Sequence, residues 1–405
     1  FPKFHVATLV DNVDNEQISI GKYFKCDEII YENENCLENI VQKADEYDKT
    51  SAQGQKEDMD YVFRNDNNSK YRTLDYVSCW YILAGDYIKN TRIRCAFVST
   101  NSICQGEQTT ILWKEIISNG ININFAYRTF RWDSEASLKA HVHCIIVGFS
   151  YNNRDNKIIY DNGKVNIVKN INAYLVDAPN IFIDNNSNPI CNVSKADFGS
   201  MPNDNGFLSD YTEEEVKEIN AKYPESQNMF KLFVGATEFL HNKKRYCLWL
   251  KDVSPMLIKK VPPVYSAVEK VKELRINSTR EATKKLADTP MLFGEIRQPD
   301  NDYLVIPCHS SEKRRYIPIG YVDKNVICSN ANIIVPNASL YSFGILMSNV
   351  HNSWMRAVSG RLEMRYRYSA KIVYNNFPWP KPTEEQKSKI ENTAVIKIQS
   401  TATIP

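Results

Sequence analysis

The order of apolar segments in the first half of the chain most constrains its fold. Residues 74–88 carry apolar side chains at helical spacing, and residues 93–100 form a short apolar run typical of a buried strand. Residues 111–120 predict a helix that ends at a glycine, and residues 123–132 and 141–150 predict two strands joined by a polar loop. An order of helix, strand, helix, strand and strand predicts an α/β fold.

A polar stretch rich in Asn and Lys is expected to link this region to a second one. We place the first region at residues 1–160, the linker at residues 152–170, and a region of mixed strands and helices at residues 171–380. The segment PWPKP is expected to end the ordered structure. In the tail, residues 381–405, the segment TEEQKSKIENTA predicts a short capped helix.

Length and composition place the chain among globular proteins. Its 405 residues are too many for one core of usual size, and 43% hydrophobic with 24% charged residues argues against wholesale disorder. No apolar run approaches the ~18 residues of a membrane helix, and no secretory pattern opens the chain, so a cytoplasmic location is expected. The first residue is Phe rather than Met, which suggests further residues upstream.

Cysteine and histidine give no support for a metal site. Ten scattered cysteines without a CxxC pair are expected to be reduced thiols. His141 and His143 lie two residues apart beside an apolar strand, and no third ligand is evident near them. No metal is therefore expected.

Basic residues are concentrated late in the chain, although the net charge is only +2. They gather at residues 268–285, 311–316 and 360–371. A DNA-binding surface needs such local density to displace counterions from phosphates. For residues 268–285, a solvated helix face is an equal alternative.

Several sequence blocks occur in the order typical of one family. The chain resembles the part of gamma-class DNA adenine-N6 methyltransferases that follows the catalytic motif, through FVSTNSICQGEQ, INFAYRTFRW and AHVHCIIVGF. More narrowly, it resembles the MmeI-like (Type IIL) restriction–modification enzymes, through FGSMPNDNG, FVGATEFLHNKKRYCLWL, SSEKRRYIPIGY and NASLYSFGILMSNVHNSWMRAVSGRL. The likeness covers roughly residues 56 to 380.

The resemblance implies a partial Rossmann-like methyltransferase sheet followed by an α+β target-recognition domain that binds double-stranded DNA. It also implies methyl transfer from S-adenosylmethionine to the exocyclic amine of a flipped adenine. An Asn-Pro-Pro-aromatic segment holds that amine in the family. Here this segment is missing, because Asp48 is followed directly by Lys49. Either it was left out of the sequence, or it has been deleted and the protein is inactive.

Two residues of the first region take roles from the resemblance. Phe149 occupies the position of an aromatic side chain that stacks on the extruded adenine, a contact worth about 1–3 kcal/mol. An ordinary core phenylalanine is the alternative. Asp75 matches the helix start that lines the cofactor and target pocket, and a plain helix N-cap is the alternative.

Glu363, Arg365 and Arg367 are the candidate base contacts of the second region. If this segment is extended, these side chains point to one face and the residues between them pack on the other. Arginine pairs with guanine, and glutamate accepts a hydrogen bond from the cytosine amine. The resemblance implies that this stretch carries variable specificity positions. A surface ladder of salt bridges is the alternative.

A dense cluster of donors in the segment SSEKRRYIPIGY is suited to binding phosphates. Its members are Ser310, Ser311, Lys313, Arg314 and Arg315. Substitutions in this cluster are expected to weaken binding to every DNA sequence. Substitutions at Glu363 or Arg365 are instead expected to change the preferred sequence.

The sequence leaves three functions open. The first is site-specific DNA adenine-N6 methylation, and the second is a specificity module that binds DNA without catalysis. The third is an endonuclease, but the Glu385-Gln386-Lys387 segment of the tail lacks the strand and upstream acid of a nuclease site. A nuclease domain or subunit would therefore stand outside this chain.

Overall fold

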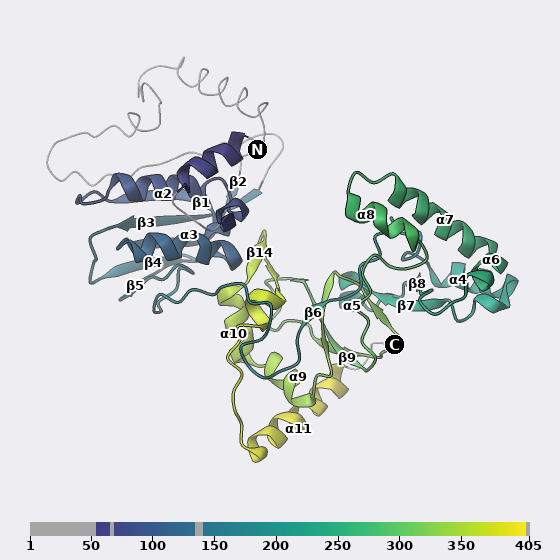
Figure 1. Ribbon diagram of the computed structural model, residues 1–405. Coiled ribbons are helices and arrows are strands. Elements are labelled where there is room, and N and C mark those ends of the chain that lie inside the picture. Colours follow the sequence, from purple (N-terminus) through teal and green to yellow (C-terminus); the bar gives the residue numbers. More distant parts are fainter. Residues whose placement is uncertain (1–53, 65–68, 134–140, 402–405) are drawn as a thin grey trace. The chain divides into compact units, whose positions relative to one another are not determined.

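The protein is divided into two units, and each is described by itself. The computed structural model describes residues 54–64, 69–133 and 141–401 (Figure 1). The first unit ends at Ile183, and the second begins at Asp184. Within the described ranges, no helix has the length and apolarity to cross a bilayer.

The first unit contains one sheet and several helices. Its elements are a helix over residues 54–62, η2 (Ser69–Thr73), α2 (Ser78–Tyr87), β1 (Cys95–Thr100), η3 (Asn101–Cys104), α3 (Gly106–Ser118), β2 (Asn122–Asp133), β3 (His141–Ser150), β4 (Lys157–Asp161) and β5 (Lys164–Val168). The five strands are arranged in the order β1-β3-β2-β4-β5. β3 runs antiparallel to β1 and β2, and β4 runs parallel to β2. The predicted order of helix, strand, helix, strand and strand is confirmed.

One face of this sheet packs against α2 and α3 through aromatic side chains. Tyr81 of α2 and Trp113 of α3 meet edge to face, with ring centroids 5.4 Å apart. Phe149 of β3 lies 5.6 Å from Tyr81, and Phe97 of β1 lies 5.7 Å from Phe149. The buried Tyr81 hydroxyl shares a 3.0 Å hydrogen bond with Ser99, so its polar atom is satisfied. Strands and helices that were predicted separately thus share one core.

The predicted linker instead contributes a hairpin to the sheet. β4 and β5 pair antiparallel around Asn162 and Gly163, whose φ angles are 50° and 76°. An Asn-Gly pair with positive φ is the usual two-residue hairpin turn. The linker prediction is therefore wrong for residues 157–168. Each strand has only five residues and is bordered by polar residues, so the composition of the surrounding stretch concealed them.

The second unit combines small sheets with helices, as the mixed-class prediction required. Its strands are β6 (Asp197–Phe198), β7 (Phe230–Val234), β8 (Tyr246–Leu248), β9 (Tyr303–Pro307), β10 (His309–Ser310), β11 (Gly320–Val322), β12 (Ile327–Cys328), β13 (Asn332–Pro336), β14 (Gly360–Leu362) and β15 (Arg365–Arg367). Its helices are α4 (Glu213–Lys222), η4 (Pro224–Ser226), α5 (Ala236–His241), α6 (Pro255–Lys260), α7 (Pro262–Ile276), α8 (Glu281–Lys285), η5 (Leu286–Asp288), α9 (Leu340–Leu346), α10 (Asn349–Val358), η6 (Ala370–Tyr374) and α11 (Glu384–Thr401). The strands of the described residues form sheets in the orders β11-β9-β13-β6, β12-β7-β8 and β10-β15-β14.

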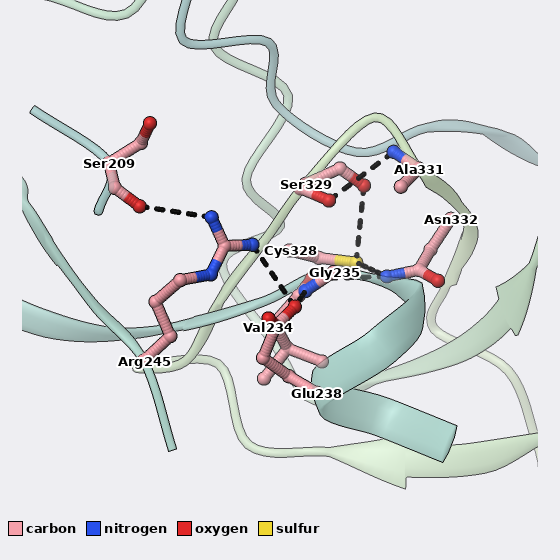
Figure 2. Close-up of polar contacts among 9 residues, drawn as sticks. All are labelled: Ser209, Val234, Gly235, Glu238, Arg245, Cys328, Ser329, Ala331 and Asn332. Carbon is pink, nitrogen blue, oxygen red and sulfur yellow. Dashed lines mark hydrogen bonds and ion pairs between the residues drawn. The ribbon is translucent and has the colours of Figure 1, made fainter. Parts of the chain in front are cut away.

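A cluster of polar contacts ties the start of α5 to neighbouring strands (Figure 2). Glu238 Oε2 accepts hydrogen bonds from the Gly235 N–H at 2.8 Å and from Arg245 Nη2 at 3.0 Å. A Cβ atom at position 235 would lie 2.6 Å from Glu238 Oε2, so glycine permits this approach. Asn332 of β13 donates to the Val234 carbonyl at 3.0 Å. The FVGATEFL block therefore holds the junction of β7 and α5 against β13.

Ordered structure continues beyond the PWPKP segment, contrary to the prediction. The capped helix predicted there is α11, which is longer than the predicted segment. The Thr383 N–H donates to Gln386 Oε1 at 2.9 Å, and the Gln386 N–H donates to Thr383 Oγ1 at 3.3 Å. α11 packs beside α9 (Figure 1), where a Cβ at Gly344 would lie 2.6 Å from Ile390 Cγ2. The helix is part of the second unit's packing, not a free tail.

Candidate nucleic-acid interface

One sheet of the second unit brings together two segments that lie far apart in the sequence. In the order β10-β15-β14, β15 is the central strand. Ser310 of β10 lies opposite Tyr366 of β15, and His309 lies opposite Arg367. The predicted phosphate cluster and the predicted base contacts are therefore neighbours.

The predicted base contacts lie on a tight hairpin rather than on one extended strand. Glu363 and Met364 form the turn between β14 and β15, and Glu363 has a φ of 59°. The extended arrangement is therefore wrong for Glu363, because the chain reverses there. Arg365 and Arg367 lie two residues apart on β15, and both are exposed. Across the turn, Arg365 Nη2 donates to Glu363 Oε2 at 2.9 Å.

Along β15 and just beyond it, packed tyrosines alternate with the exposed arginines. The half-buried Tyr366 ring is covered by the Arg361 guanidinium, 4.3 Å from the ring centroid. Tyr368 is 3% exposed, and its N–H donates to the Cys308 carbonyl at 2.8 Å. The exposed arginines therefore lie on a strand whose position is fixed by the packing of Tyr366 and Tyr368.

The segment between β10 and β11, here called the basic loop (residues 311–316), carries exposed cations. Ser311 Oγ accepts a hydrogen bond from the Lys313 N–H at 3.2 Å and shapes the loop into a turn. Ser310 differs from its neighbours, because it is 6% exposed and its Oγ has no hydrogen-bond partner among the described residues. A hydroxyl buried in this way does not reach a phosphate, so Ser310 is a position within the sheet. The exposed residues of the loop are Lys313, Arg314 and Arg315.

Positive charge accumulates where β10 meets β15. The pKa of His309 is lowered from its usual value, first by burial and then by the charges of Arg367 and Arg365. Nearby cations disfavour a further positive charge, so the part of this lowering that comes from Arg367 and Arg365 reflects their positive charge beside the ring. Such a surface attracts the phosphates of a nucleic acid.

The basic stretch at residues 268–285 has a structural member that the sequence did not reveal. Arg275 of α7 is fully buried, and its guanidinium donates only to main-chain carbonyls. It is neither a nucleic-acid contact nor part of a solvated helix face. Lys270 and Arg280 instead line an open pocket beside the loop at residues 202–207.

The structure places Phe149 in the core of the first unit. Its side chain is 1% exposed, and its ring contacts those of Tyr81, Phe97 and Trp113. An enclosed ring cannot stack on an extruded base without breaking this packing. Its surroundings are those of the alternative, an ordinary core phenylalanine.

Asp75 joins the start of α2 to the segment after β1. Its carboxylate accepts hydrogen bonds from Ser102 Oγ and, at 3.1 Å, from Gln108 Nε2. Its N–H donates to Gln108 Oε1 at 3.1 Å. The N-cap position of α2 is Val77, without a side-chain hydrogen bond, so Asp75 is not a plain cap. The network lies just beyond Thr100, at the carboxyl end of β1, where open α/β sheets bind ligands.

The missing catalytic segment and the metal prediction both depend on which residues the structure describes. The junction of Asp48 and Lys49, where the Asn-Pro-Pro-aromatic segment is missing, lies outside them. Within residues 54–64, 69–133 and 141–401, no three His, Cys, Asp or Glu side chains are grouped to hold a metal ion.

A buried histidine behind β15 was not predicted. His351 Nδ1 lies 2.9 Å from the Leu346 carbonyl, and Nε2 lies 3.2 Å from the Tyr368 hydroxyl. Because a carbonyl only accepts, Nδ1 carries the proton, and Nε2 accepts from Tyr368. Burial lowers the pKa of His351 to about 4. No local pattern marks this residue, since its polar partners lie outside its own helical turn.

The second unit is expected to lose stability as the pH falls from about 6.5 towards 4. The pKa of His351 is lower in the folded than in the unfolded state, so the unfolded state binds the proton first in this window. The contribution is complete above pH 6.5 and falls by up to about 3 kcal/mol as the pH approaches 4. Urea unfolding at several pH values measures it. His351→Gln should flatten the dependence, and an unchanged slope in that variant would contradict the assignment.

Comparison with known proteins places both units. Residues 46–161 match the DNA-methyltransferase domain of MmeI, and residues 177–381 match the MmeI target recognition domain. "DNA methyltransferase A" of Bacillus subtilis (strain 168) is 41% identical over 344 residues, covering 85% of this chain and 39% of that protein. The Type IIL restriction-modification enzyme MmeI, solved in complex with DNA, is 45% identical with a TM-score of 0.80. That alignment covers 87% of this chain and 48% of the MmeI chain.

The chain thus spans less than half the length of either relative. The two domain matches follow each other in the order that the sequence blocks predicted. The structural agreement also confirms the predicted class, a methyltransferase sheet followed by a recognition domain. The chain belongs to the MmeI family.

Proposed function

We propose that the protein acts in site-specific DNA adenine-N6 methylation and that its second unit reads the target sequence. The observation that carries this proposal is the sheet β10-β15-β14, which sets two exposed arginines beside the basic loop. This sheet lies in the region that matches a target recognition domain. Sequence-specific binding requires both kinds of contact on one surface, because phosphate contacts position a protein and base contacts specify the sequence.

Glu363 and Arg365 form a pair that DNA can open. Their side chains are 62% and 49% exposed, and an ion pair so exposed is worth about 1 kcal/mol or less. A guanine edge can therefore displace the carboxylate from Arg365 at small cost. Glu363 is then free to accept a hydrogen bond from a cytosine amine. Without DNA, Glu363 and Arg365 bind each other as a surface salt bridge. On DNA, the same two side chains would bind bases instead.

The first unit is proposed to border the cofactor and the target base. S-adenosylmethionine, the donor that the family implies, supplies an activated methyl group when bound. The exposed Asp75 carboxylate, at the carboxyl end of β1, fits a border of such a pocket. Through Ser102 and Gln108 it holds the segment that leads into α3. Asp75 would thus act as a positioning residue for this side of the pocket.

Methylation of DNA by the full protein tests the proposed function. Unmethylated plasmid is incubated with the protein and S-adenosylmethionine, and modified adenines are mapped by single-molecule sequencing. Methylation at one recurring sequence supports the proposal. Sequence-specific binding without methyl transfer would support the specificity module instead, and the absence of both would refute the two together.

Neutralising the basic loop is expected to weaken binding to all sequences alike. The triple variant Lys313→Ala, Arg314→Ala, Arg315→Ala removes up to three phosphate contacts. Each contact contributes about 0.9 to the slope of log K against log salt, so the slope should shrink by about 2 to 3. Fluorescence anisotropy on preferred and scrambled duplexes measures this.

The matched control is Lys389→Ala on α11, which removes an exposed lysine paired with Glu385. It should leave the salt dependence unchanged. A loss confined to the preferred duplex in the triple variant would show that the loop reads bases instead of clamping phosphates.

A further inference from the structure

Side chains of helix α10 (Asn349–Val358) form hydrogen bonds with the backbone of the basic loop and of the residue just after it. Asn352 Oδ1 accepts a hydrogen bond from the Ile317 N–H at 2.8 Å, just after the loop. Arg356 Nη2 donates to the carbonyls of Arg314 at 3.3 Å and Arg315 at 2.5 Å. Asn352 and Arg356 are one helical turn apart, so they act from the same face of α10. These hydrogen bonds involve main-chain atoms of residues 314, 315 and 317, and not the charged side-chain groups of the loop.

The same helix holds the strand that carries the exposed arginines. His351 accepts a hydrogen bond from the Tyr368 hydroxyl, and Tyr368 follows Arg367 directly. The Phe377 ring packs edge to face against the histidine ring, with centroids 4.8 Å apart. Both His351 and Tyr368 are buried, so the end of β15 has little freedom to shift relative to α10. One helix therefore anchors both segments of the proposed interface.

We propose that α10 is a positioning element that sets the basic loop and β15 in register with each other. Arg356 and Asn352 fix the loop, and His351 fixes β15. This inference rests on the proposed function, because it takes the basic loop and β15 to be the two DNA-contacting segments of the second unit. Phosphate contacts fix where a protein sits, and base hydrogen bonds form only at that position. Loss of the loop anchor should therefore change the salt dependence of binding, and loss of the β15 anchor should change the sequence preference.

Arg356 is tested by its dependence on the loop. Arg356→Met in the full chain should reduce the magnitude of the salt slope by about 1 or more, on preferred and scrambled duplexes alike. In a chain that already carries the triple loop substitution, Arg356→Met should have no further effect on the slope. Arg356→Lys, which can donate to one carbonyl at a time, should give an intermediate slope.

Two outcomes would overturn the role of Arg356. An equal reduction of slope in both backgrounds would mean that Arg356 binds a phosphate itself. An unchanged slope in both would mean that the loop needs no anchor. A chain without any sequence-dependent DNA binding would count against the proposed function instead, so the two failures are distinguishable.

His351 is tested by discrimination between sequences. His351→Leu should reduce the ratio of affinities for preferred and scrambled duplexes roughly 5- to 10-fold, with the salt slope retained. His351→Gln, which can still bond to Tyr368, should recover most of that ratio. Tyr368→Phe, which removes only the hydroxyl bonded to His351, should lower the ratio and keeps the test decisive if the leucine variant does not fold. Val350→Ala, at an exposed position of α10, is the matched control. An unchanged ratio in the folded variants, with or without a change of slope, would refute the assignment of His351 to β15.

Discussion

Arg275→Met is expected to lower the free energy of unfolding of the second unit by roughly 3–5 kcal/mol. The guanidinium is fully buried and donates to the carbonyls of Asn203, Pro202, Leu286, Thr289 and Leu292, at 2.9 to 3.2 Å. Methionine has a similar volume but no donors, so these acceptors would lose their partner in a buried site. A buried acceptor without a partner costs about 1–3 kcal/mol.

The geometry explains why lysine should not rescue this position. The guanidinium joins the turn before Asp204 to the end of α7 and to the segment around Leu292, in several directions at once. A lysine ammonium has fewer donors and no planar fork. Urea unfolding of Arg275→Met and Arg275→Lys should therefore show large losses in both.

Arg280→Met is the matched control, because Arg280 lies in the same basic stretch and is exposed. Its free energy of unfolding should change by less than about 0.5 kcal/mol. A similarly small change in Arg275→Met would show that the carbonyls find water or other donors. That result would contradict the stabilising role of Arg275.

Arg365→Ala is expected to change which DNA sequence is preferred. A bidentate contact between arginine and guanine is worth about 1–3 kcal/mol of discrimination, which is roughly 5- to 150-fold in relative affinity. Affinity for scrambled duplexes should change much less, because one exposed charge contributes little to phosphate binding as a whole. Selection from a random duplex library, before and after the substitution, measures the change at each base pair.

Arg361→Ala provides the comparison on the neighbouring strand. The Arg361 guanidinium lies over Tyr366 and donates to the Met364 carbonyl at 3.3 Å, so it is occupied within the hairpin. Its loss should leave the preferred bases unchanged. If Arg365→Ala lowered the affinity for every sequence equally, Arg365 would be a phosphate contact, and the division between the loop and β15 would be wrong.

Long, strongly periodic elements could be predicted from the sequence, whereas short ones could not. α3 has 13 residues and β3 has 10, and each carries enough apolar positions to show its period. β4 and β5 have 5 residues each and are bordered by Asn, Asp and Lys, so their few apolar residues were hidden within a polar stretch. The length of α11 was missed for a related reason, because its partner α9 lies elsewhere in the chain.

The sequence alone determined the family, the order of elements in the first unit, and the presence of three stretches rich in basic residues in the second. These properties depend on local periodicity, local charge and the order of recognisable blocks. Only the tertiary structure decided that Phe149 and Ser310 are buried, that Glu363 lies in a turn, and that Arg275 is a structural cation. It alone also placed the basic loop beside β15 and both on α10. Such features arise from contacts between residues distant in the chain, which a local pattern does not encode.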